Sequence, residues 1–80
     1  MTEALDKLYT ICSKILLIDK TEINGNISRK DIEEWDSMAH LILVSELEQN
    51  FDIIMEDEEI ANIKNISDIK DALKKYGVEI

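Results

Sequence analysis

The sequence predicts an all-α protein: a small four-helix bundle with three longer helices, one short third helix and a long loop between the first two. Apolar residues recur at helical spacing in several separate stretches, and the chain contains no proline to interrupt them. Its 80 residues suffice for one domain with a small core. We therefore expect residues 1–80 to form a single domain.

The first helix is expected to begin with Thr2 as its N-cap and to end near Ile18. Its apolar stripe advances by three or four residues: Leu5, Leu8, Cys12 and Ile15. We therefore predict that Cys12 is a thiol buried in the core. Since it is the only cysteine, it cannot form an internal disulfide, which fits a reducing cytoplasm.

A long connection follows from Asp19 to Asp36, with a turn at Asn24-Gly25-Asn26. Loops of this length in small domains are commonly functional. Four large apolar residues are expected to anchor it across the helices: Ile23, Ile27, Ile32 and Trp35. We interpret Trp35 as a core residue, the alternative being a surface on which a ligand stacks.

The second helix is predicted over about Ser37 to Asn50, and at 100° per residue its faces separate. The predicted core face contains Leu41, Leu43, Val44, Leu47 and Phe51. The opposite face contains Met38, Ile42, Ser45 and Gln49, with Glu46 beside them. Two apolar side chains next to Ser37 indicate a docking patch rather than chance exposure.

The last two helices have clear boundary signals. A short third helix is predicted around Glu56 to Asn62, with an acidic first turn that suits the helix dipole. Asn65 is the predicted N-cap of the fourth, and Gly77 after two lysines is its predicted stop. Its apolar stripe consists of Ile66, Ile69, Leu73 and Tyr76.

The charge is strongly acidic and unevenly distributed. The formal net charge is −9, which argues against direct nucleic-acid binding. No lysine or arginine occurs from Asp31 to Ile63, a segment with eleven acidic residues. Basic proteins are the natural partners of such a surface, the alternative being a merely solvated face. The longest apolar runs are four residues and the N-terminus carries no secretory signal, so we expect a cytoplasmic protein without a membrane span.

The residues of this chain do not support several other chemistries. Ser37, His40 and Asp36 do not suit a nucleophilic triad, because Asp36 adjoins Ser37 while His40 faces the core side. His40 is interpreted as a partly buried structural histidine. One cysteine and one histidine cannot form a zinc site, and Glu56-Asp57-Glu58-Glu59 lacks the ligand spacing of an EF-hand, so no metal site is predicted.

Ser37 stands out at the start of the second helix. Asp36 can cap this helix, which leaves the Ser37 hydroxyl free where backbone N–H groups favour anions. An exposed hydroxyl in this position suits permanent attachment of a phosphate-linked group.

Trp35-Asp36-Ser37-Met38 and the helix behind it resemble the acyl carrier protein family, over nearly the whole chain. The resemblance implies that Ser37 carries 4′-phosphopantetheine from coenzyme A and that acyl groups travel on its thiol as thioesters. It matches Asp36 to the family's aspartate before the serine, and it implies that Glu46 and Glu48 belong to the acidic helix that basic partner enzymes recognise. Met38 and Ile42 are expected to contact partners through the docking patch on the outward face of the helix. The implied partners are a phosphopantetheinyl transferase, a loading ligase and acyl-processing enzymes with basic docking surfaces, acting on a monomer that is not itself an enzyme.

The cargo is left open by this resemblance. Trp-Asp-Ser-Met-Ala-His-Leu is similar to free-standing carriers of specialised or aminoacyl pathways, whereas Ile42 lies where fatty-acid carriers usually place a charge. An aminoacyl or peptidyl carrier is therefore the alternative within the class. Outside it, the alternative is an acidic helical adaptor that binds a basic partner without a cofactor.

Overall fold

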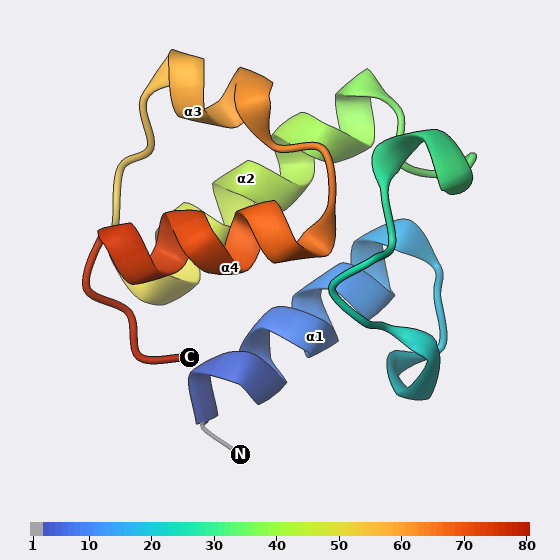
Figure 1. Ribbon diagram of the computed structural model, residues 1–80, viewed down its shortest axis with the longest axis horizontal. Helices are drawn as coiled ribbons and strands as arrows, with labels where there is room; N and C mark the ends of the chain where they lie inside the picture. The colour runs from blue at the N-terminus through green and yellow to red at the C-terminus, as the bar shows by residue number, and fades with distance from the viewer. Residues whose placement is uncertain (1–2) are drawn as a thin grey trace.

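The computed structural model describes residues 3–80, which fold into four α-helices (Figure 1). The helices are α1 (Glu3–Leu16), α2 (Ser37–Phe51), α3 (Asp57–Asn62) and α4 (Ile66–Lys75). α1 runs opposite to α2 and α4, and the short α3 lies at the edge of the bundle, above α2 and α4 in Figure 1. The all-α prediction is confirmed, with three longer helices and one short one. The proposed cap Thr2 lies outside the described residues.

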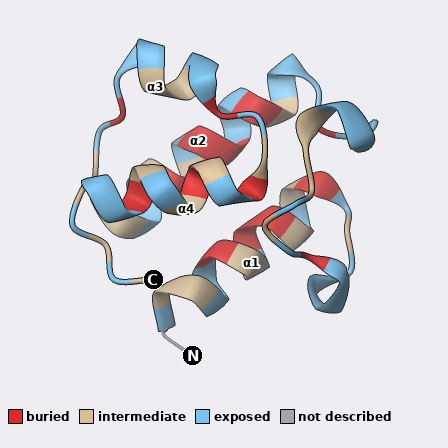
Figure 2. Cartoon of the chain, in the orientation of Figure 1, coloured by how far each residue is buried: buried red, intermediate tan, exposed pale blue. Residues whose placement is uncertain are grey.

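The core is formed by the apolar stripes of α1, α2 and α4, seen as the inward red bands in Figure 2. Leu8 and Cys12 of α1, Leu47 of α2 and Leu73 of α4 are fully buried. Burial raises the pKa of the Cys12 thiol to about 12, so this thiol stays protonated at neutral pH. The prediction that Cys12 is a core residue is confirmed.

α1 ends two residues earlier than the sequence predicted. Leu17 adopts a left-handed conformation, with φ of 57°, which stops the helix after Leu16. Ile18 then packs against the core as a partly buried residue outside the helix. The carbonyl of Ile18 accepts a hydrogen bond from the Ser13 hydroxyl at 2.5 Å, which secures the chain beyond the helix end.

The long loop between α1 and α2 contains two short 3₁₀ turns, Lys20–Glu22 and Arg29–Asp31. Its expected anchors are confirmed: Ile23 and Trp35 are buried, while Ile27 and Ile32 pack against the core. Backbone hydrogen bonds also join the loop to the start of α4, from Arg29 N to Lys64 O (2.8 Å) and from Ile66 N to Ile27 O (3.0 Å). No pattern in the sequence indicated this second attachment.

The predicted ends of α4 are confirmed. The Asn65 side chain accepts a hydrogen bond from Asp68 N at 2.7 Å, as an N-cap does. At the other end Gly77 has φ of 89°, and the N–H groups of Gly77 and Val78 donate to the carbonyls of Lys74 and Leu73. This pairing is a Schellman motif, which glycine favours because it has no Cβ.

α3 is held to the rest of the bundle by its surroundings rather than by a buried face. None of its six residues is buried, whereas Met55 before it and Ile63 after it are. The Glu59 carboxylate accepts a hydrogen bond from the Tyr76 hydroxyl and pairs with Lys75 Nζ at 3.2 Å. The hydrogen bond from Tyr76 lowers the pKa of Glu59 and raises the pKa of Tyr76. α3 is therefore held by these polar contacts together with Ile60, which is partly buried against the core.

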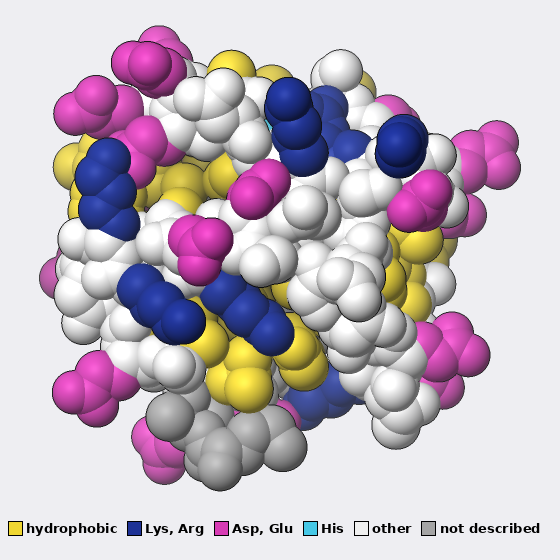
Figure 3. All heavy atoms as spheres, in the orientation of Figure 1, with side chains coloured by type: hydrophobic (Ala, Val, Ile, Leu, Met, Phe, Trp, Pro, Cys, Tyr) yellow, Lys and Arg dark blue, Asp and Glu magenta, His cyan; other side chains and the backbone are white. Residues whose placement is uncertain are grey.

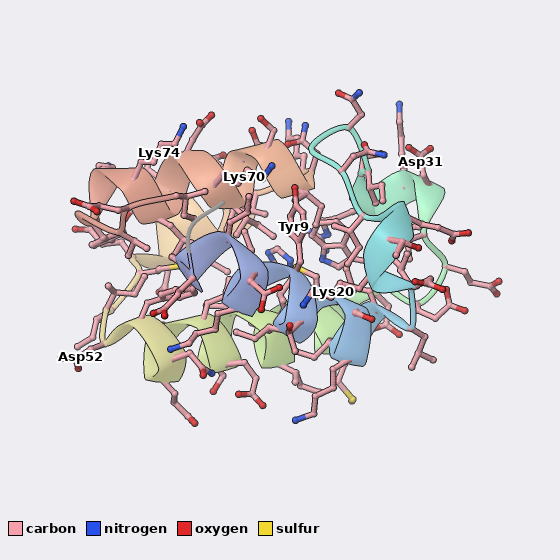
Figure 4. The ribbon with its side chains drawn as sticks, turned by 90° about the horizontal axis from the view of Figure 1, so that it is seen from below. Tyr9, Lys20, Asp31, Asp52, Lys70 and Lys74 are labelled. Carbon is pink, nitrogen blue, oxygen red and sulfur yellow. The ribbon has the colours of Figure 1, made fainter. Side chains whose placement is uncertain are left out.

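The charges are divided between elements. Lys and Arg side chains are spread over the face that has α4 in front, shown in Figure 3. The segment without basic residues forms α2, α3 and their connections, and it extends from Asp31 at one end of the molecule to Asp52 at the other (Figure 4). On the α4 side, Lys70 Nζ lies 5.0 Å from the centre of the Tyr9 ring and ties α4 to α1.

Candidate functional site: the serine at the start of α2

Ser37 is the first residue of α2 and is exposed to solvent. The preceding Asp36 has an extended backbone, and its carboxylate accepts a hydrogen bond from Ala39 N at 2.8 Å. Asp36 is therefore the N-cap, as predicted, and the Ser37 hydroxyl is not needed for this purpose. The first-turn N–H groups and the helix dipole favour a negatively charged group at this end.

Capping by Asp36 makes a specific prediction about stability. Asp36→Ala is expected to lower the free energy of unfolding by about 1 kcal/mol, because the Ala39 N–H loses its acceptor. Asp36→Asn is the control, since an asparagine oxygen accepts the same bond and should largely restore stability. Urea unfolding followed by circular dichroism measures both. Equal stability of Asp36→Ala and the wild type would contradict the assignment of the cap.

The outward face of α2 next to Ser37 is apolar. Met38 is 72% exposed and Ile42 is 48% exposed, so the prediction that both point outward is confirmed. Leu41 is 63% exposed, and its predicted place in the core is wrong. Leu41 follows Ser37 by one helical turn and so shares the side of α2 on which Ser37 is exposed. We call Met38, Leu41 and Ile42 the apolar strip.

The buried stripe of α2 begins with a histidine in the place predicted for Leu41. It consists of His40, Leu43, Val44 and Leu47, at the spacing of one helix face. His40 is only 4% exposed, more buried than the sequence suggested. Phe51, the other predicted core residue, is partly buried against the core. α2 is therefore rotated slightly from the predicted helical phase, so that His40 rather than Leu41 lies in the core.

His40 can be buried because both of its ring nitrogens have partners. Trp35 Nε1 donates to Nδ1 at 3.0 Å, and Nε2 lies 2.8 Å from the carbonyl oxygen of Ile60. Trp35 itself is 2% exposed, which confirms its predicted role as a core residue. Since both nitrogens are engaged, His40 is not oriented to act as a base for Ser37. The prediction of a structural histidine fits this geometry.

Glu46 and Glu48, which are expected to contact partner enzymes, both interact with other residues of this chain. Glu46 lies 3.9 Å from Lys14 Nζ of α1, with its side chain about one-third exposed. Glu48 accepts a hydrogen bond from Met55 N at 2.7 Å and so holds the connection between α2 and α3. In the sequence, the carboxylates that stand closest to Ser37 are Asp36 and the exposed Glu33 and Glu34 of the loop before it.

A groove of about 760 Å³ runs between α1 and α2, but it lies away from Ser37. α2 contributes only Glu46 and Asn50 to its lining, while α1 contributes the remainder, including Ile11 and Ile15. Ser37 thus stands on an open helix end rather than in a groove. Among residues 3–80, no group of three or more His, Cys, Asp or Glu side chains is placed to hold a metal ion. Over the same range no helix is long and apolar enough to cross a bilayer.

The fold and the site together define a small helical bundle with an exposed serine at the start of its second helix. No family model matches this sequence. The chain is 34% identical over 74 residues to an acyl carrier protein of Clostridium acetobutylicum, an alignment that covers 92% of this chain and 96% of that protein. A solved structure described as a candidate acyl carrier protein from Mycobacterium tuberculosis superposes with a TM-score of 0.82, at 26% identity, over 91% of this chain and 97% of that one.

The chain belongs to the acyl carrier protein family. The findings therefore support a carrier function rather than the acidic adaptor. Acyl carrier proteins are carriers rather than catalysts, they bear a phosphopantetheine group, and they work with acyl-processing enzymes.

Proposed function

We propose that Ser37 carries the phosphopantetheine arm and that the chain presents acyl groups on it to separate enzymes. The observation that carries this proposal is the exposed Ser37 hydroxyl, left free because Asp36 caps the helix. The arm's phosphate fits at this point, where the N–H groups of the first turn favour negative charge. When attached, the arm supplies a thiol that holds the cargo as a thioester.

Attachment is tested by incubating the chain with coenzyme A and a phosphopantetheinyl transferase. We expect the intact mass to rise by one phosphopantetheine group, on the peptide that contains Ser37. An unchanged mass with several different transferases would contradict the proposal. Loading the modified chain with acyl groups and, separately, with amino acids by adenylating ligases then decides between an acyl cargo and the aminoacyl alternative.

We propose that partner enzymes dock on the apolar strip, with carboxylates around it attracting their basic residues. Met38 and Ile42 lie within about two turns of Ser37, and Leu41 lies between them. Glu46 flanks the far end of the strip, while Glu48 contributes through its charge although its carboxylate also holds Met55 N. An exposed apolar cluster with a charged rim is typical of a protein-binding surface.

Ile42→Glu is expected to impair modification or cargo loading without unfolding the chain. Ile42 is half exposed, so the free energy of unfolding should change by less than about 0.5 kcal/mol. Gln49→Glu is the matched control, since it adds the same charge at an exposed position about 10 Å farther along α2. Reaction rates and melting temperatures of both variants measure the effect. A large fall in melting temperature for Ile42→Glu, or equal rates in both variants, would contradict docking at the strip.

The chain is also proposed to act as a monomer in the cytoplasm. The cytoplasmic location is supported by the unpaired, buried Cys12, because disulfides mark oxidising compartments. The monomeric state is supported by the net charge of −9, which opposes self-association.

A further inference from the structure

A chain of two hydrogen bonds links the residues on either side of Ser37 to α3. Trp35, two residues before Ser37, donates from Nε1 to Nδ1 of His40, three residues after it, at 3.0 Å. Because an indole N–H can only donate, Nδ1 must be the accepting nitrogen. Nε2 then carries the hydrogen of the neutral ring and donates to the carbonyl of Ile60 at 2.8 Å. The two partners thus define one neutral tautomer.

These two hydrogen bonds span the turn that presents Ser37. Trp35 and His40 are both almost fully buried, and His40 N also donates to Asp36 O at 2.9 Å. The carbonyl of Ile60 belongs to α3, which has no buried residue of its own. His40 therefore connects the first turn of α2 with α3.

We propose that His40 is a positioning residue for Ser37: through Trp35 and Ile60 it holds the first turn of α2 against α3, and protonation of its ring releases Trp35. A second proton on the ring must be bound by Nδ1, which then points an N–H at the indole N–H. The hydrogen bond between the two side chains is lost, and the turn around Ser37 loosens. The functional part of this inference rests on the proposed attachment at Ser37.

The surroundings of the ring favour its neutral form. Burial lowers the pKa of His40, the hydrogen bond to the Ile60 carbonyl acts in the opposite direction, and the Arg29 guanidinium of the second 3₁₀ turn lowers it further. The carboxylates on the adjoining elements are exposed or bound to other partners: Glu33, Glu34, Asp36, Glu56, Asp57, Glu58 and Glu59.

The sign of the pH effect follows from the lowered pKa. The unfolded chain begins to bind a proton near pH 6.5, whereas the folded chain resists it. The contribution of this site to stability is therefore complete above pH 6.5 and declines as the pH falls through the lower pKa of the folded state. We expect the melting temperature of the wild type to fall in this range more than that of a variant without the ring.

The test uses the fact that the chain has one tryptophan and one histidine. Trp35 fluorescence and the His40 ring signals in NMR are expected to titrate together, with a midpoint below 6.5 and an unchanged helical circular dichroism spectrum. His40→Gln is the conservative variant, because an amide can accept from the indole and donate to Ile60 without titrating. Its fluorescence should show no such transition. Independent titrations of Trp35 and His40, or the same transition in His40→Gln, would overturn the proposal.

The link to Ser37 is measured as a ratio of modification rates. Dividing the wild-type rate by that of His40→Gln, with the same transferase at each pH, removes the pH dependence of the transferase. We expect a constant ratio above pH 6.5 and a fall of about tenfold one pH unit below the midpoint, as the neutral fraction of His40 falls. A constant ratio throughout overturns the positioning role. If neither protein is modified at any pH, the proposed attachment at Ser37 fails and the positioning role fails with it, while the fluorescence result still stands.

Trp35→Phe provides a second variant that does not depend on the folding of His40→Gln. It keeps an aromatic ring in the core but removes the N–H that Nδ1 accepts. The penalty for protonating His40 becomes smaller, so its NMR midpoint should move upward from the wild-type value. An unchanged midpoint would show that the bond from Trp35 does not control the ring.

Discussion

Ser37→Ala is expected to abolish covalent modification completely while the bundle stays folded. The hydroxyl is the proposed point of attachment, and Ser37 is the only residue from Asp36 to His40 that has a hydroxyl group. The free energy of unfolding should change by less than about 0.5 kcal/mol, because Asp36 and not Ser37 caps the helix. Intact-mass measurement and thermal unfolding on the same sample test both statements.

Ser45→Ala is the matched control for this substitution. Ser45 is also an exposed serine of α2, about two turns farther along, and its removal should leave the added mass unchanged. Full modification of Ser37→Ala would place the arm elsewhere and overturn the assignment. A marked loss of stability in Ser37→Ala would instead show that the hydroxyl takes part in the fold.

Leu47→Ala is expected to have the largest effect on stability, at about 2–5 kcal/mol. Leu47 is fully buried on the face of α2 that packs into the core, so truncation leaves a cavity as well as removing apolar contact. Domains have total stabilities of about 5–15 kcal/mol, and small ones lie low in this range. The loss therefore removes a large share of the whole, and urea unfolding measures it.

Gln49→Ala serves as the control for Leu47→Ala. Gln49 lies two residues away on the same helix but is exposed, so its truncation should change the free energy of unfolding by less than about 0.5 kcal/mol. A cost below about 1 kcal/mol for Leu47→Ala would mean that this face of α2 is not packed as the structure shows.

The candidate site was largely predictable because its features are local. Asp36 caps α2 through an N–H only three residues away, and the position of Ser37 follows from that cap. Met38 and Ile42 point outward because of helical spacing alone. Leu41 was missed, although its position one turn after Ser37 was a signal for its exposure.

The sequence by itself determined the four helices, the start of α2, both ends of α4 and the acidic segment. Each depends on residues within a turn or two of one another: apolar spacing, the caps Asp36 and Asn65, and the stop at Gly77. The absence of basic residues from Asp31 to Ile63 is also a property of the sequence alone.

Only the tertiary structure decided which side of α2 became buried at its first turn. A leucine is ordinarily preferred to a histidine in a core, and the exchange of Leu41 for His40 depends on two partners. One is the Trp35 indole, and the other is the Ile60 carbonyl, twenty residues away in sequence. The role of Glu48 was also decided only by the tertiary structure. Its carboxylate accepts a hydrogen bond from Met55 N in the connection to α3. Burying a polar group is costly unless its hydrogen bonds are satisfied, and these partners come together only when the chain has folded.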